Sequence, residues 1–186
     1  MNKVDMMQRL ANYPVLSRPM DQGYIEARFV PVEGIEAVDE SLVSNVSIIP
    51  VVGGQYAVMQ LSDGRWELAG GTLEPGEHYM NALRREVMEE LGAELVSFRL
   101  MAQIINHSSA PKPYRPHIPH PVCIRLIGYG EIQVVCSPLN PPDGEQVAAV
   151  ETVSIDEAVR RFRSIGREDI AEYYLYAHQL RTAGQA

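Results

Sequence analysis

The chain is poor in cysteine and lysine, and it lacks any long apolar run. Its two cysteines, Cys123 and Cys136, form no CxxC motif and are too few for a disulfide framework, which favours a reducing compartment. No apolar run approaches the roughly 18 residues that a membrane-spanning helix needs. The N-terminal stretch also lacks the charged, apolar and small-residue pattern of a secretory signal. We therefore expect a cytoplasmic protein with no membrane partner.

Positive charge is scarce as well, since 16 lysines and arginines stand against 24 aspartates and glutamates and the formal net charge is −8. A protein that neutralises a long phosphate backbone needs an excess of basic residues, so we expect no long nucleic acid as a partner. A small anionic ligand remains compatible with this charge, because a bound divalent cation can invert the local field.

The length and composition are those of one globular domain, with 186 residues of which 46% are hydrophobic. A chain of this size buries roughly 70% of the surface that it exposes when unfolded, which allows a substantial core. Alternating and β-branched residues predict strands at 24–32, 46–52, 55–61, 66–68, 94–105 and 121–136. Helical patterns are expected around Met6, Met7 and Leu10, at 79–91, from a capping box at Ser154, and at 168–181. Residues 106–120 contain too many prolines to form either element.

Three glutamates gather on the helix predicted at 79–91. Glu86, Glu89 and Glu90 are spaced i, i+3 and i+4, so their side chains share one face of the helix. Carboxylates so close together repel one another unless a cation neutralises them, and hard oxygen ligands select Mg²⁺ or Mn²⁺. A separate apolar stripe can dock the helix on a sheet; it consists of Met80, Leu83, Val87 and Leu91. Taken alone, the acidic face is more typical of a solvated helix than of a metal site.

The segment around these glutamates favours the metal over the solvated face. Gly71 is followed after five residues by Glu77, and after seven more by the run Arg85-Glu86-Val87-Met88-Glu89-Glu90-Leu91-Gly92. This segment, Gly71 to Ala93, resembles the complete box of the Nudix hydrolase family. It departs from the usual pattern at Ala93, which is smaller than the customary branched residue, and at Ala69, where a proline often precedes the paired glycines.

The resemblance implies an α/β fold, a Nudix-type α/β/α sandwich with a mixed central sheet and the Nudix loop-helix. It also implies that water cleaves the pyrophosphate bond of a nucleoside diphosphate linked to another moiety. In that family the glutamates matching Glu86, Glu89 and Glu90 bind Mg²⁺ or Mn²⁺, helped by a backbone carbonyl that matches Gly70.

Further residues of the box are expected to support this site. Glu77 and Arg85 match the pair that fixes the loop against the helix, and Gly71 and Gly92 match the glycines that bound the motif. We count Arg85 with the catalytic group because its planar fork can orient carboxylates.

Cleavage also needs a carboxylate that takes a proton from water. Glu89 or Glu90 can serve, but family members differ in where this base lies. Glu145, in a loop before the capping-box helix, is a further candidate, although an exposed loop carboxylate without a role is an equal alternative.

The proline-rich segment 106–120 is long for a connection inside a compact domain, which is typical of a functional lid or a disordered tip. We expect it to overhang the site, with Tyr114 stacking on a base and Lys112 or Arg115 contacting phosphate or ribose. His117 and His120 do not predict a metal site, because Pro119 prevents the helix that would align them.

The substrate within the family is not settled by the sequence. Markers of ADP-ribose and dinucleoside polyphosphate enzymes fall cleanly on neither Pro111 nor Tyr114, so these markers assign no substrate. A slight preference for ADP-ribose or a nucleotide sugar comes instead from the N-terminal residues. Residues 1–43 are expected to form an N-terminal extension that packs on the core or serves dimerisation, and residues 44–186 the Nudix domain with C-terminal helices. The extension resembles the N-terminal strands of dimeric nucleotide-sugar members, so we expect a homodimer.

Two other functions remain open. A sensor or binding module with the Nudix fold would bind a nucleotide sugar without cleaving it, but the intact glutamate set favours catalysis and no DNA-binding pattern is evident. An enzyme that removes RNA caps would share the chemistry, and the acidic charge disfavours it.

Overall fold

The computed structural model describes residues 10–21 and 23–183. Met6 and Met7, around which an N-terminal helix was expected, lie outside these residues. The described chain is built around one mixed sheet with the strand order β1-β2-β8-β9-β3-β4-β10. The strands of this path are β1 (Met20–Asp21), β2 (Ile25–Pro31), β3 (Val43–Val52), β4 (Gln55–Leu61), β8 (Arg99–Ser108), β9 (Val122–Val134) and β10 (Val147–Val153). Three short strands pair outside it: β5 (Trp66–Glu67) with β4, β6 (Gly70–Thr72) with β3, and β7 (Ala93–Leu95) with β9.

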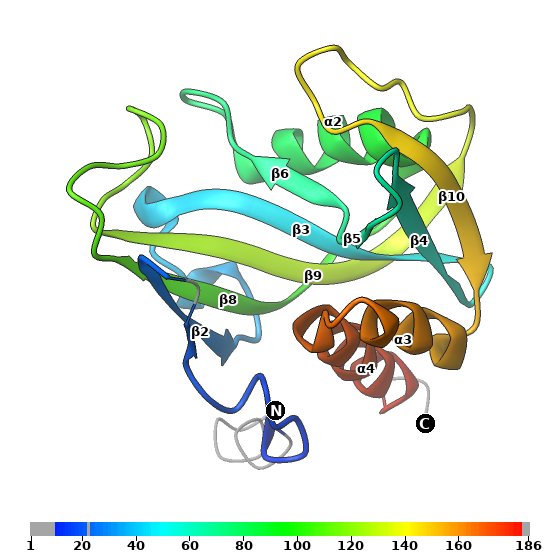
Figure 1. Ribbon diagram of the computed structural model, residues 1–186, viewed down its shortest axis with the longest axis horizontal. Helices are drawn as coiled ribbons and strands as arrows, with labels where there is room; N and C mark the ends of the chain where they lie inside the picture. Colours follow the sequence, from blue (N-terminus) through cyan, green and yellow to red (C-terminus); the bar gives the residue numbers. More distant parts are fainter. Residues whose placement is uncertain (1–9, 22, 184–186) are drawn as a thin grey trace.

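Helices cover both faces of this sheet (Figure 1). Helix α2 (Tyr79–Leu91) packs on one face, and α3 (Ile155–Ser164) and α4 (Glu168–Ala183) pack on the other. The β3 and β9 strands run parallel, while the neighbouring pairs are antiparallel. The predicted α/β/α sandwich with a mixed sheet is therefore confirmed. None of the helices in the described chain is long and apolar enough to span a membrane.

Each face has its own apolar core. The stripe predicted for α2 is buried on the sheet through Leu83, Val87 and Leu91. On the other face, the core includes three tyrosines of α4 whose rings pack against Phe29 of β2 and Tyr56 of β4; they are Tyr173, Tyr174 and Tyr176. Burial of such side chains, at roughly 25 cal/mol per Å² of apolar area, is the main source of stability on both faces.

The helix ends are set by local sequence. Helix α2 begins after His78, whose Nδ1 accepts a hydrogen bond from the Met80 N–H at 3.2 Å. It ends at Gly92, which has a φ of 58° and donates to carbonyls of the last turn. The capping box is also formed, since the Ser154 hydroxyl accepts from the Glu157 N–H at 3.3 Å.

The N-terminal strands extend the sheet. Strand β2 pairs antiparallel with β8, from Ile25 opposite Ser108 to Pro31 opposite Ala102, which confirms the strand expected at 24–32. The segment before it is fastened to α4, because the buried Glu172 carboxylate accepts hydrogen bonds from the N–H groups of Val15 and Leu16.

Two sequence-based expectations were wrong in detail. The single strand predicted at 94–105 is split into β7 and β8, because the N–H groups of Val96 and Ser97 both turn to the Glu131 carbonyl and interrupt the ladder. The irregular segment begins later than residue 106, since Asn106 and His107 still pair with β2 on one side and β9 on the other.

Candidate active site

The turn between β6 and α2 is held by close backbone packing. Gly70 has a φ of 130°, and a Cβ at this position would collide with the Val46 carbonyl of β3. A Cβ on Gly71 would collide with the Glu86 carboxylate. Glycine is therefore required at position 70 for the turn to lie this close to the sheet, and glycine at position 71 leaves room for the Glu86 carboxylate of α2.

Arg85 connects the loop before α2 to the helix. Its Nε and Nη2 donate to the two carboxylate oxygens of Glu77 at 3.1 and 3.0 Å, and Nη2 also lies 3.3 Å from the Thr72 carbonyl. The hydrogen bonds from Arg85 hold the pKa of Glu77 below its ordinary value. Glu77 in turn accepts from the Glu74 N–H at 2.8 Å, so that the loop is fixed at two points.

The same guanidinium reaches the acidic face of the helix. Its Nη1 lies 2.8 Å from Glu86 and 3.5 Å from Glu89. Within residues 10–21 and 23–183, no three His, Cys, Asp or Glu side chains are arranged as a ready metal-binding group. The three glutamates have other partners instead, because Arg85 draws two of them toward itself and the Gly70 N–H binds the third, Glu90, at 2.8 Å.

Glu90 is the most buried of these carboxylates, with 7% of the residue exposed. Burial raises the pKa of Glu90 to about 9, against the opposing hydrogen bond from the Gly70 N–H and with the help of the neighbouring negative charge of Glu86. Burial likewise raises the pKa of Glu86. A site that disfavours negative charge so strongly gains stability from a proton or a cation.

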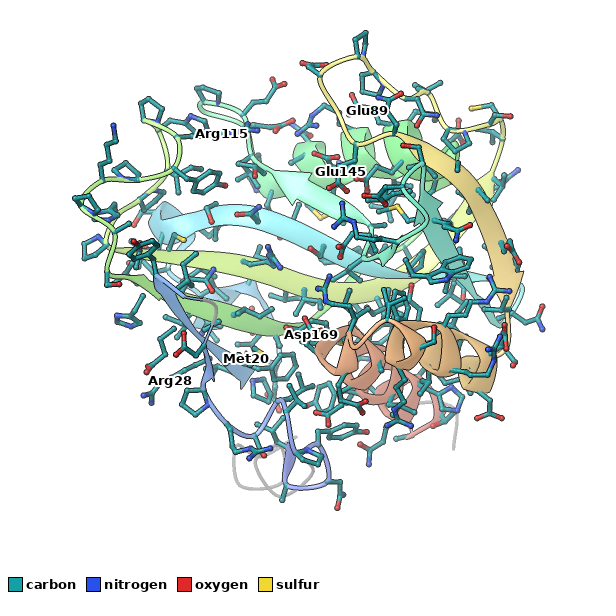
Figure 2. All side chains as sticks on the ribbon, in the orientation of Figure 1. Met20, Arg28, Glu89, Arg115, Glu145 and Asp169 are labelled. Atoms are coloured by element: carbon teal, nitrogen blue, oxygen red, sulfur yellow. The ribbon has the colours of Figure 1, made fainter. Side chains whose placement is uncertain are left out.

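These groups line one end of a cleft of about 600 Å³, which is within the size range of nucleotide-sized ligand sites. Glu67 of β5 and Glu145 of the loop before β10 face the helix carboxylates across it. Glu89 and Glu145 both line the cleft, and Figure 2 labels both on the α2 side of the sheet. Burial, and then the charge of Glu67, raise the pKa of Glu145. Glu67 itself is paired with Arg167 at 2.9 Å.

The other end of the cleft lies over β2, β8 and β9. Its walls include Met20, Ile25 and Ala27 from the N-terminal strands, and Ile104 and Asn106 from β8. It is completed by Arg125 of β9 and by Asp169 and Tyr173 of α4. Figure 2 shows Met20 and Asp169 on this side, away from Glu89. The N-terminal extension thus forms part of the cleft wall.

The proline-rich loop contributes one side chain to the cleft, which is Arg115. Tyr114 is 61% exposed, and its hydroxyl lies 2.9 Å from the Thr72 hydroxyl beside the glycine turn. Lys112 is exposed and does not line the cleft. His117 and His120 each bond a backbone carbonyl, of Leu73 and Ala110 respectively, so the two imidazoles serve separate contacts.

Several cleft residues were not anticipated from the sequence. Glu67, Arg167 and Asp169 form an ion-paired group on the cleft wall, and Glu67 stands 100 positions before Arg167 in the chain. The pairing of strands and the packing of α4 bring these three residues together, and no local sequence pattern predicts that contact. Arg125 did carry a signal, because it is a charged residue inside the apolar run of β9.

Three comparisons with known proteins bear on this site. A family model described as the NUDIX domain matches residues 42–175. A protein of Escherichia fergusonii named nucleoside triphosphatase NudI is 26% identical over 128 residues, covering 66% of this chain and 80% of that protein. Its namesake from Salmonella agona is 47% identical over 49 residues, which covers 23% of this chain and 35% of that protein.

The solved structures agree in fold. The Bacillus subtilis pyrophosphohydrolase BsRppH, in the crystal structure of a point mutant, superposes with a TM-score of 0.54 at 19% identity, over 73% of this chain and 77% of that one. A NUDIX hydrolase from Nitrosomonas europaea superposes with a TM-score of 0.50 at 19% identity, over 74% of this chain and 89% of that one.

Proposed function

Because the chain belongs to the NUDIX family and is a pyrophosphohydrolase of that family, we propose that it cleaves a nucleoside diphosphate derivative with the help of Mg²⁺ or Mn²⁺. The observation that supports this most directly is the meeting of the α2 carboxylates with the Gly70–Gly71 turn at one end of a nucleotide-sized cleft. The homologous nucleoside triphosphatases add nucleoside triphosphates to the ADP-ribose and nucleotide sugars suggested by the sequence.

The donor set suits such a cation. Glu86, Glu89 and Glu90 offer hard oxygen ligands, and Glu90 is buried with a strongly raised pKa, so a divalent cation would relieve an unfavourable charge. The Gly70 carbonyl is a further proposed ligand. When bound, the ion supplies positive charge to the phosphate oxygens and lowers the pKa of a coordinated water.

Arg85 acts as a positioning residue in this proposal. It holds Glu86 and Glu89 on the cleft side of α2 while it fastens Glu77 and the loop. The carboxylates are therefore kept in place before a substrate arrives, which reduces the entropy lost in the reaction.

For the proton acceptor we favour Glu145 over Glu89 and Glu90. The Glu89 carboxylate lies near Arg85 and that of Glu90 accepts from Gly70, whereas the Glu145 carboxylate has no hydrogen bond or ion pair with any residue of the described chain. Burial also raises the pKa of Glu145 above its ordinary value, which strengthens it as a general base.

The test is phosphate release from a panel of nucleoside triphosphates, ADP-ribose and nucleotide sugars with Mg²⁺ or Mn²⁺. We expect Glu145→Gln to lower kcat by about 100-fold or more, since general-base removal costs roughly 10² to 10⁴. Glu89→Gln should also lower activity, because it removes a proposed ligand of the cation. The matched control is Glu94→Gln, an exposed glutamate of β7 outside the cleft. Full activity in Glu89→Gln would overturn the metal assignment. Binding of a nucleotide sugar with no hydrolysis of any substrate would identify a binding module instead.

We also infer a cytoplasmic homodimer. Within the described chain, strand β1 stands at the end of the sheet order and the nearby Tyr24 is 72% exposed, which supports pairing of the N-terminal strands with a second copy of the chain.

A further inference from the structure

The end of the cleft over β2 is apolar on its walls. Met20, Ile25 and Ala27 supply one side from the N-terminal strands, and Ile104 of β8 lies beside them. The first three residues precede the range matched by the family, which begins at residue 42. One wall of this end therefore comes from outside the matched family domain, and the other comes from within it.

Hydrogen-bond donors stand among these apolar walls without a protein partner. Arg125 lines the cleft and has no hydrogen bond or ion pair with any described residue. Its side chain shares a sheet face with Ile104 on one side and Asn45 on the other, since these residues are paired in register. Tyr173 also lines the cleft, is 3% exposed, and its hydroxyl makes no hydrogen bond within the described chain.

The charges on this wall balance, because Arg125 and Arg167 stand against Asp169 and Glu67, and Arg167 is ion-paired with both carboxylates. Asp169 and Arg125 act on the Tyr173 hydroxyl in opposite directions. An additional phosphate would gain from Arg125 but would meet two carboxylates that share one arginine. A neutral, flat ring with carbonyl oxygens meets every condition, because it covers the apolar walls and its oxygens accept from the guanidinium and the hydroxyl.

We propose that the β2 end of the cleft binds the base of the nucleotide substrate, and that Arg125 selects bases with carbonyl acceptors. This inference rests on the proposed hydrolase function and deepens it. Arginine has only donors, in a planar fork that fits the O6 and N7 acceptors of guanine, and it also suits the O4 of uracil or thymine. Adenine and cytosine present an amino donor at the corresponding edge, so the guanidinium loses at least one of the acceptors that guanine or uracil would offer it.

The test is calorimetric titration with GMP, UMP, AMP and CMP, which lack the bond that the enzyme would cleave. The wild-type protein is expected to bind GMP at least about fivefold more tightly than AMP, and UMP more tightly than CMP, since a bidentate contact is worth about 1–3 kcal/mol. Arg125→Met is expected to bring these ratios close to one. Arg125→Lys keeps the charge but lacks the planar fork, so it should also bring the ratios close to one. This second variant provides the test if Arg125→Met does not fold.

The matched control is Arg99→Met on the neighbouring strand β8, an exposed arginine outside this cleft, which should keep the wild-type ratios. Equal binding of all four nucleotides by the wild-type protein would overturn the proposal. So would a uniform weakening in Arg125→Met with the ratios kept, because Arg125 would then bind phosphate. Base preference without any hydrolysis would refute the hydrolase function alone, and hydrolysis without the preference would refute this inference alone.

Discussion

At the scale of single residues, Arg85 organises the site by its shape as much as by its charge. One planar group meets Glu77 through two parallel hydrogen bonds, reaches Glu86, and still contacts the Thr72 carbonyl. A lysine has the same charge but places it on one nitrogen, so it cannot make these contacts together. Among the described contacts, the partly buried Glu86 would lose the one donor that it has, and Glu77 would keep only the Glu74 N–H.

We therefore expect Arg85→Lys to lower the free energy of unfolding by about 1–3 kcal/mol, the usual cost of leaving a partly buried charged group without its hydrogen bond. The control is Arg84→Lys on the same helix, because Arg84 is exposed and makes one long contact of 3.5 Å with the Met80 carbonyl. Urea denaturation measures both. Equal stability of the two variants would contradict the role of Arg85 in fixing the loop.

At the scale of elements, the sequence predicts best where the determinants are local. The bounds of α2, its Gly92 terminus and the Ser154 capping box depend on neighbouring residues, and all are present in the structure. The position of β7 and the far wall of the cleft depend on long-range pairing with β9 and β8. The apolar pattern of those segments predicts that they are strands, but it does not predict which strands they pair with. The proximity of Arg125 and Tyr173 could therefore not be predicted from the sequence.

The end of α2 provides a test at this scale. Gly92 and Gly166 both have positive φ, at 58° and 75°. An alanine at Gly166 would meet nothing within 4 Å, whereas a Cβ on Gly92 would collide with the Cys136 carbonyl. Gly166→Ala should cost about 1–2 kcal/mol for the left-handed backbone alone. Gly92→Ala should cost at least about 1 kcal/mol more, because the following chain must shift. Thermal unfolding of the pair decides this, and equal losses would show that the close approach is unimportant.

At the scale of the whole molecule, a net charge of −8 is concentrated unevenly. Glu67, Glu86, Glu89, Glu90 and Glu145 all line one cleft. Two arginines beside them, Arg85 and Arg167, are already committed to ion pairs with Glu86 and Glu67. The acidic composition that disfavours a long nucleic acid is thus compatible with a small polyanionic substrate, provided that a divalent cation accompanies it.

A divalent cation should consequently stabilise the folded protein against heat. Binding of the cation to the folded state alone contributes about 2.7 kcal/mol at a concentration of roughly 100 times Kd, which for a chain of this size raises Tm by roughly 5–10 °C.

The pKa of Glu90 is raised to about 9 in the folded protein, so without metal this carboxyl group ionises at a lower pH in the unfolded chain. The stability of the fold should therefore fall as pH rises from about 4.5 toward 9. Glu90→Gln keeps an acceptor for the Gly70 N–H and removes the buried charge. It should therefore unfold at a higher temperature than the wild-type protein in a chelator, show a flatter pH dependence, and gain little from Mg²⁺ or Mn²⁺. Scanning calorimetry with and without metal measures all three effects, and a metal-induced gain in Glu90→Gln equal to that of the wild-type protein would place the cation elsewhere.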